Sequence, residues 1–195
     1  MAVHADPRVD PDRRARLLGI VDELGPAFRE RAPRYDREAS FPFENFDDLY
    51  DAGFYGLCIP TRYGGLGASF NDYMHIGAAL GAYCPMTALT FNMHTQTVLW
   101  TGVAADDLDM TDEDRAVHEA RRTELYRRII EEKALQSQPL SEGIAQGATR
   151  GFATTAERVD GGYRVNGRKI FASLSGAASD YNITCVETSE DEILF

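Results

Sequence analysis

The stretch GGYRVNGRKIFAS, residues 161–173, predicts two short β-strands that meet at glycine turns. Tyr163 and Val165 alternate with polar residues, which is the period of a strand with one buried face. Asn166-Gly167 can adopt the positive φ that a two-residue hairpin turn requires, and Asp160-Gly161-Gly162 is a second turn just upstream. The stretch therefore predicts an antiparallel meander.

Strand-like patterns lie on both sides of this stretch, whereas helical periodicity ends near residue 134. Helices followed by antiparallel strands are the order of an α+β fold. We predict an N-terminal all-α helical bundle over residues 1–134 and an incomplete antiparallel β-barrel or meander over residues 135–195. An apolar end without a cap suggests that the chain stops in mid-sheet. The strands are expected at residues 152–159, 163–166, 170–173, 181–186 and 193–195.

Four or five helices are expected in the first part, where apolar residues recur at helical spacing after capping residues or prolines. The first begins at Asp10-Pro11, and the pair Gly25-Pro26 is expected to kink or split it because proline removes a backbone bond. The last begins at Thr111. It is expected to turn Val117, Leu125, Tyr126, Ile129 and Ile130 inward and Arg121, Arg122, Arg127 and Arg128 outward.

The fourth predicted helix, residues 86–100, carries no formal charge. A helix that is uncharged all round is typical of a position buried on most sides. We take two of its residues, Phe91 and His94, as candidates for a substrate cavity. The alternative for His94 is a core histidine with one satisfied ring nitrogen.

Composition limits the classes of partner. The 195 residues include 20 basic and 31 acidic ones, which gives a net charge of −11. This balance argues against nucleic acid and against anionic membrane surfaces. No apolar run approaches the ~20 residues of a membrane span, and the polar N-terminus lacks a signal-peptide core. We therefore expect a cytoplasmic protein.

The sequence has no metal or phosphate motif. Three cysteines without CxxC spacing (Cys58, Cys84, Cys185) argue against zinc and disulfides and predict buried thiols. The acidic loop at residues 106–109 lacks the glycine and the terminal glutamate of a calcium loop. Gly64-Gly65-Leu66-Gly67 lacks the lysine and the following hydroxyl of a P-loop. No metal is expected.

Three motifs together resemble the acyl-CoA dehydrogenase family, and the similarity runs from about residue 10 to the end. They are the loop IPTRYGGLG at residues 59–67, the segment Ser141-Glu142-Gly143 and the segment NGRKIFAS at residues 166–173. Their order and the gapless spacing between the last two make the combination specific. The resemblance implies an N-terminal helical domain, a middle β-barrel domain and a C-terminal four-helix domain, with FAD between the last two.

By resemblance, two loops of this chain line the flavin. The first matches residues 138–147, where Ser141 takes the place of the hydroxyl that bonds the pyrimidine edge of the ring. In the second, Phe171 lies against the isoalloxazine and Ser173 lies near N5. Gly143 replaces the proline that the family usually carries. The expected cofactor-binding residues are Gln138, Leu140, Ser141, Gly147, Phe171, Ala172 and Ser173.

The function that the resemblance implies is α,β-dehydrogenation of an acyl thioester with hydride transfer to N5 of FAD. The family's catalytic base lies in the C-terminal domain, so no catalytic residue is expected in this chain, and the chain alone is expected to be inactive. The implied partners are an acyl-CoA-type substrate, an electron-transferring flavoprotein or oxygen as electron acceptor, and further copies of the chain. The alternatives are a flavin-dependent monooxygenase of the same fold and a non-catalytic truncated remnant or scaffold.

Overall fold

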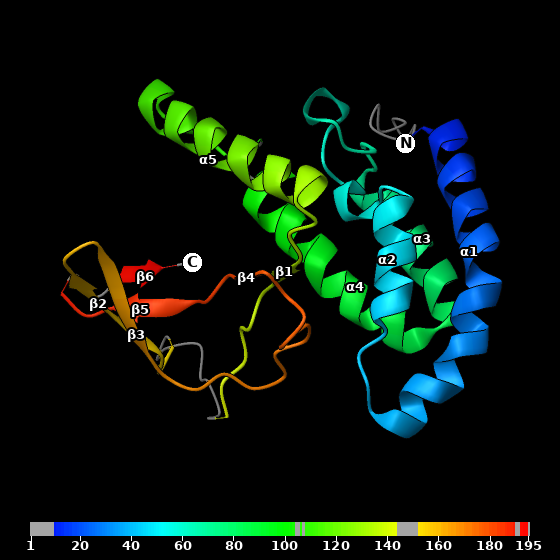
Figure 1. The fold of residues 1–195 in the computed structure, drawn as a ribbon. Coiled ribbons are helices and arrows are strands. Elements are labelled where there is room, and N and C mark those ends of the chain that lie inside the picture. The colour runs from blue at the N-terminus through cyan, green and yellow to red at the C-terminus, as the bar shows by residue number, and fades with distance from the viewer. Residues whose placement is uncertain (1–9, 104–105, 107, 144–151, 190–191, 195) are drawn as a thin grey trace, which may run out of the picture. The chain divides into compact units, whose positions relative to one another are not determined.

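The computed structural model describes residues 10–103, 106, 108–143, 152–189 and 192–194. The chain divides into two compact units, one up to Leu135 and one from Gln136. Among the described residues, the first unit holds the helices and the second holds the strands (Figure 1). The helices are α1 (Pro11–Glu38), α2 (Phe43–Asp51), α3 (Phe70–Tyr83), α4 (Pro85–Val98) and α5 (Asp112–Glu131), with a π-helical turn at Leu99–Val103 and 3-10 turns at Phe54–Gly56 and Thr61–Tyr63.

Local signals set the start of α1. The side chain of Asp10 accepts hydrogen bonds from two backbone N–H groups of the first turn, and Pro11 occupies the first helical position. Pro26 does not split the helix, which continues past it and bends in its C-terminal part (Figure 1). At Gly25, an added Cβ would lie 2.4 Å from the Tyr83 ring of α3. This close packing of α1 on α3 supports the helix beside the missing backbone bond.

Aromatic rings form much of the core of the helical unit. The ring of Phe46 lies 6.3 Å from those of Tyr55 and Phe91, and the His94 ring lies 5.0 Å from that of Tyr55. One face of α4 is buried here, but Leu89 on the same helix is 62% exposed. The absence of charge therefore predicted the buried face of α4 and overestimated its extent.

The buried face of α5 differs from the predicted one. Tyr126 is buried as expected, but Val117 is exposed and Arg122 is only 3% exposed. Two carboxylates, Glu119 and Asp106, form ion pairs with the guanidinium of Arg122. Their charges compensate a buried cation that helical periodicity had assigned to solvent.

The described strands form two small sheets, one of mixed direction and one that is parallel. In one sheet the order is β3-β2-β5-β6, where β2 pairs with β5 in parallel and the outer pairs are antiparallel. In the other, β1 and β4 are parallel. The predicted order of helices followed by strands is confirmed, but no barrel forms among the described strands, and mixed pairing replaces the predicted incomplete antiparallel barrel or meander. The strands are β1 (Gln136–Ser137), β2 (Thr155–Val159), β3 (Gly162–Asn166), β4 (Asp180–Tyr181), β5 (Cys185–Glu187) and β6 (Glu192–Leu194).

One of the two predicted turns is confirmed. Asp160-Gly161 connects β2 and β3, with Gly161 at φ 80°. Asn166-Gly167 does not form a hairpin, since no strand follows β3 directly. An added Cβ at Gly167 would lie 2.4 Å from Oγ1 of Thr154, so the glycine permits this close approach instead. The chain then crosses to β4 without a strand, so the strand predicted at residues 170–173 is absent.

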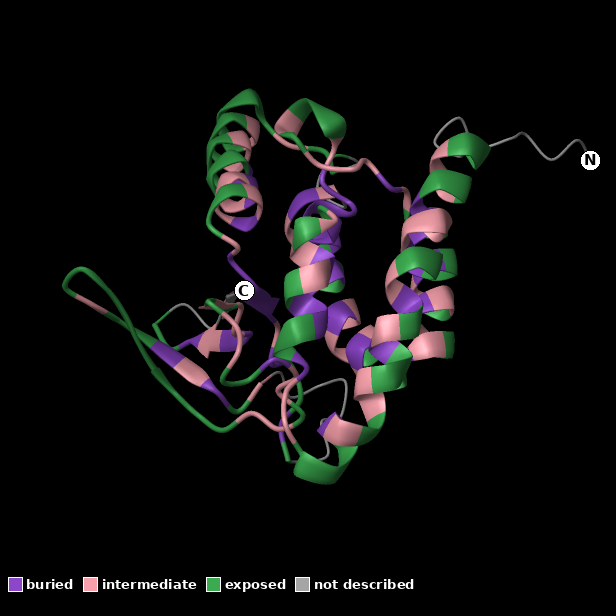
Figure 2. Ribbon diagram, turned by 45° about the vertical axis from the view of Figure 1, so that its right-hand side comes forward, coloured by how far each residue is buried: buried purple, intermediate pink, exposed green. Residues whose placement is uncertain are grey.

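The hairpin also lacks the predicted buried face. Tyr163 and Val165 are 43% and 47% exposed, and all of β3 is exposed (Figure 2). Alternation shows that the two side chains share a face but not that another layer covers it. Strand β3 is instead an exposed edge of its sheet.

The three cysteines are free and buried, as predicted. Within the described ranges, no group of three or more His, Cys, Asp or Glu residues could hold a metal ion. The helices that the structure describes include none long and apolar enough to cross a membrane.

Candidate functional site

Two segments of the strand-bearing unit come together, although about thirty residues separate them in the sequence. The backbone N–H of Ile170 donates to the carbonyl of Ser141 at 2.9 Å. The hydroxyl of Ser137 donates to the carbonyl of Ser173 at 2.7 Å. Because these two bonds lie at opposite ends of the segments, residues 137–141 and 170–173 lie side by side.

These segments carry six of the seven predicted cofactor residues, and Gly147 lies outside the described residues. Leu140 is 48% exposed and Phe171 is 85% exposed. Ser141 is also exposed, whereas Gln138, Ala172 and Ser173 are half-buried. The exposed side chains are thus available to a ligand.

Phe171 combines exposure with an unfavourable backbone. Its φ is 53°, and Leu174 three residues later has φ 70°. A bulky residue with positive φ is strained, at a cost of about 1–2 kcal/mol. Such strain persists where the surroundings over-determine the conformation, and it clusters at functional sites. The structure therefore holds an aromatic ring toward solvent in a conformation that its own backbone does not favour.

The buried carboxylate of Glu142 connects these segments to the chain at residues 153 and 154. One carboxylate oxygen accepts the backbone N–H of Ala153 at 2.6 Å. The other accepts the backbone N–H and the hydroxyl of Thr154 at 2.9 and 2.6 Å and the ammonium of Lys169 at 2.7 Å. The Glu142 side chain is 2% exposed and that of Lys169 is 9% exposed. Burial raises the pKa of Glu142, but the bonds from Lys169, Thr154 and Ala153 outweigh it and hold that pKa well below its usual range.

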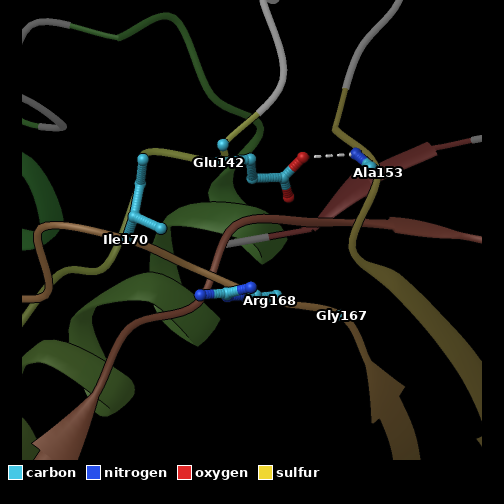
Figure 3. A pocket seen from close by; sticks show the side chains of 6 residues that line it. Glu142, Ala153, Gly167, Arg168 and Ile170 are labelled. Carbon is cyan, nitrogen blue, oxygen red and sulfur yellow. Dashed lines mark hydrogen bonds between the residues drawn. The ribbon is translucent and has the colours of Figure 1, made fainter.

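A pocket of about 440 Å³ opens beside this carboxylate. Figure 3 shows the Glu142 carboxylate directed toward Ala153, with Arg168 and Ile170 on the neighbouring segment. The lining residues are Glu142, Gly143, Ala153, Gly167, Arg168 and Ile170. The carboxylate is already engaged by the groups around it, so it is suited to holding loops rather than to accepting a substrate proton.

The two candidate substrate-cavity residues lie in the helical unit. Phe91 is 2% exposed, and His94 is fully buried with Nε2 2.9 Å from the carbonyl of Tyr55. Burial lowers the pKa of His94 to about 4, against the opposing effect of this hydrogen bond. The histidine is therefore neutral at physiological pH and packed among aromatic rings. A role in a substrate cavity stays a prediction.

The sequence motifs include Glu142 and Lys169 but indicate no contact between them, and Thr154 lies in none of the motifs. The structure joins them in one buried cluster. Their separation in sequence hid this, because no local pattern marks which lysine neutralises which carboxylate. The segment Gly167-Arg168-Lys169-Ile170 contains no acidic residue that would have marked the partner of Lys169.

Comparison with known proteins gives consistent sequence matches. Residues 23–105 match the family model "Acyl-CoA dehydrogenase, N-terminal domain". A putative acyl-CoA dehydrogenase of Bacillus subtilis is 26% identical over 178 residues, covering 90% of this chain and 44% of the relative. The amino sugar nitrososynthase of Streptomyces peucetius is 28% identical over 87% of this chain and 39% of the relative. The isobutylamine N-hydroxylase of Streptomyces viridifaciens is 32% identical over 75% and 36%. The chain thus spans less than half the length of these relatives.

A solved structure shows the same fold. KijD3 in complex with FMN and a dTDP-linked amino sugar superposes with a TM-score of 0.78 at 23% identity, over 96% of this chain and 43% of that chain. FMN-bound TdsC from Paenibacillus gives 0.72 at 23% identity, over 91% and 42%. At this level of identity, the likeness concerns the fold alone.

Proposed function

Because this chain belongs to the acyl-CoA dehydrogenase superfamily, we propose that it supplies the flavin-facing segments of a flavin-dependent oxidoreductase. The observation that carries this proposal is the pairing of residues 137–141 with residues 170–173, which holds Phe171 exposed at positive φ. A flavin needs an aromatic or apolar wall and polar donors at its edge, and these segments offer both.

In this proposal, the exposed ring of Phe171 packs against the isoalloxazine, and the hydroxyls of Ser141 and Ser173 donate to its polar edge. Gln138, Leu140 and Ala172 complete the surface. The cofactor is FAD, with FMN as the second candidate because similar solved structures contain it. A bound flavin would supply the two-electron oxidation chemistry. The residues of this chain bind and orient the ring, and none of them is assigned a proton transfer.

The first candidate reaction is α,β-dehydrogenation of an acyl thioester, with an electron-transferring flavoprotein as acceptor. The matching family model and the dehydrogenase relatives favour it. The second candidate is oxygen-dependent hydroxylation, which the similarity to an N-hydroxylase at 32% identity favours. Oxygen consumption with formation of a hydroxylated product would select the second reaction. Flavin reduction by an acyl thioester without oxygen would select the first.

Titration with FAD and with FMN tests the proposal. The chain is titrated alone and as a fusion to the C-terminal portion of the Bacillus subtilis relative, and bound flavin is measured by absorbance and by the rise in melting temperature. We expect saturable binding by the fusion at least. Absence of bound flavin in both forms would contradict the proposed function.

Phe171→Ala gives a residue-level test in the same assay. Loss of an aromatic contact worth about 0.5–1.5 kcal/mol weakens flavin binding by up to about tenfold. Tyr163→Ala is the matched control, because Tyr163 is another exposed aromatic of the same unit but lies on β3. The control is expected to bind flavin as the parent does. An equal loss of flavin affinity in the two variants would show that Phe171 does not contact the flavin.

A further inference from the structure

The Glu142–Lys169 ion pair lies where three separate segments meet. Glu142 directly follows the first flavin-facing segment, residues 137–141, and accepts hydrogen bonds from Ala153 and Thr154. Lys169 immediately precedes Ile170, whose N–H bonds the carbonyl of Ser141. The pair therefore fixes the register of the two segments at one end.

Lys169 is held by more than its charge partner. Its ammonium lies 3.4 Å from the carbonyl of Leu140 and 4.5 Å from the centroid of the Phe152 ring. With 9% of its side chain exposed, it has little contact with solvent. A lysine that is buried against a carboxylate, a carbonyl and an aromatic face has one stable position. Lys169 therefore fixes the backbone two residues before Phe171.

At the other end, the hydroxyl of Ser137 holds the carbonyl of Ser173. The strained residue Phe171 lies between these two attachments, with φ at 53°. Without one attachment, the backbone is free to relax to negative φ, which moves the ring. The ion pair thus restrains the backbone on one side of Phe171, and the Ser137 hydroxyl restrains it on the other.

From this geometry we infer that Glu142 and Lys169 are positioning residues, whose buried ion pair holds the flavin-facing segments in the conformation that binds the ring. The inference rests on the proposed function. Neither residue touches the flavin. Each acts through the segment that it anchors, so loss of either raises the apparent dissociation constant by lowering the fraction of chains that are competent to bind.

Glu142→Gln and Lys169→Met separate positioning from simple charge attraction. A flavin phosphate is anionic, so an electrostatic role predicts that Glu142→Gln strengthens binding and Lys169→Met weakens it. Positioning predicts that both weaken it. If the competent fraction falls to about a tenth, the dissociation constant rises about tenfold in each variant.

The controls come from an exposed ion pair of the same unit. Arg164 and Glu157 pair on the β2–β3 hairpin with side chains 71% and 60% exposed. Arg164→Met and Glu157→Gln make the same charge changes without releasing a buried partner, and flavin binding is expected to stay within about twofold of the parent. Lys169→Arg retains the cation and is expected to recover part of the lost affinity.

The experiment titrates FAD and FMN into the parent and each variant, in the form of the chain that binds flavin. It records the dissociation constant, the visible spectrum of bound flavin and the melting temperature without flavin. A changed spectrum at saturation separates a misplaced ring from a chain that is merely less stable. If Lys169→Met does not fold, the double variant Glu142→Gln/Lys169→Met carries the test, because it leaves no buried charge unpaired.

Weaker binding and an altered spectrum in both single variants, with unchanged controls, would support the inference. Tighter binding by Glu142→Gln, or an unchanged spectrum and affinity in Lys169→Met, would overturn it while leaving the proposed function intact. A parent that binds neither flavin would overturn both.

Discussion

Gly65 is expected to tolerate no side chain, although its backbone needs no positive φ. A Cβ at this position would lie 2.1 Å from the carbonyl oxygen of Ile59 and 2.5 Å from the Ile59 Cβ. The first of these atoms belongs to the backbone, which cannot rotate away as a side chain can. Gly65→Ala therefore forces apart the two arms of the loop.

The cost follows from the hydrogen bonds between the arms. The N–H groups of residues 66, 67 and 68 donate to the carbonyls of residues 56, 59 and 57 at 3.0, 2.9 and 2.9 Å. Each such bond contributes about 1 kcal/mol net. Separation of the arms by more than 1 Å breaks most of them, so we expect Gly65→Ala to lower the free energy of unfolding by about 3 kcal/mol.

Gly77 of α3 is the matched control, because an added Cβ there meets no atom within 4 Å. Alanine is the better helix former by about 0.8–1 kcal/mol, so Gly77→Ala is expected to raise stability. Thermal unfolding followed by far-UV circular dichroism reports the helical unit, which holds the described helices. The expected shifts are about −10 °C and about +3 °C. A Gly65→Ala variant that melts with the parent would refute the packing described for this loop.

Two further predictions concern buried titratable or charged side chains. His94 is neutral and has a pKa of about 4, against 6.5 when unperturbed, so its contribution to stability is fully present above pH 6.5 and decreases as the pH falls toward 4. Urea unfolding at pH 7.5 and pH 5 should show a loss of about 2 kcal/mol that His94→Gln abolishes, and an equal loss in both proteins would contradict this assignment. Arg122→Ala is expected to lower stability by about 2 kcal/mol because Arg122 is buried with its ion partners, whereas Arg127→Ala on the exposed side of α5 should change it by less than about 1 kcal/mol. Similar urea midpoints for the two arginine variants would show that the ion pairs of Arg122 do not stabilise the folded state more than the exposed pairs of Arg127 do.

The sequence alone determined the features that short stretches encode. The cap at Asp10, the cap at Thr111 and the turn at Asp160-Gly161 each act within a few residues, and each is present in the structure. The change from helices to strands near residue 135 follows from the same kind of signal. The match of three ordered motifs to a family also required no coordinates.

Contacts between residues that are distant in the sequence determined which side chains are buried and where glycine is required. The alternation around Val165 showed which side chains share a face but not whether that face is covered. The periodicity of α5 placed Arg122 outside, because the carboxylate of Asp106 that compensates it comes from another segment. Gly167 permits a turn, yet Thr154 requires it for close packing.

The same holds for the candidate site. Sequence motifs named Ser141, Phe171 and Ser173, but the positive φ of Phe171 and the bonds that join the two segments exist only in the folded chain. The free energy that keeps Phe171 at positive φ comes from contacts with residues that are distant in the sequence. Local propensity therefore determined the helix caps, the change from helices to strands and one turn, whereas tertiary contacts determined the strand pairing and which side chains are exposed or buried.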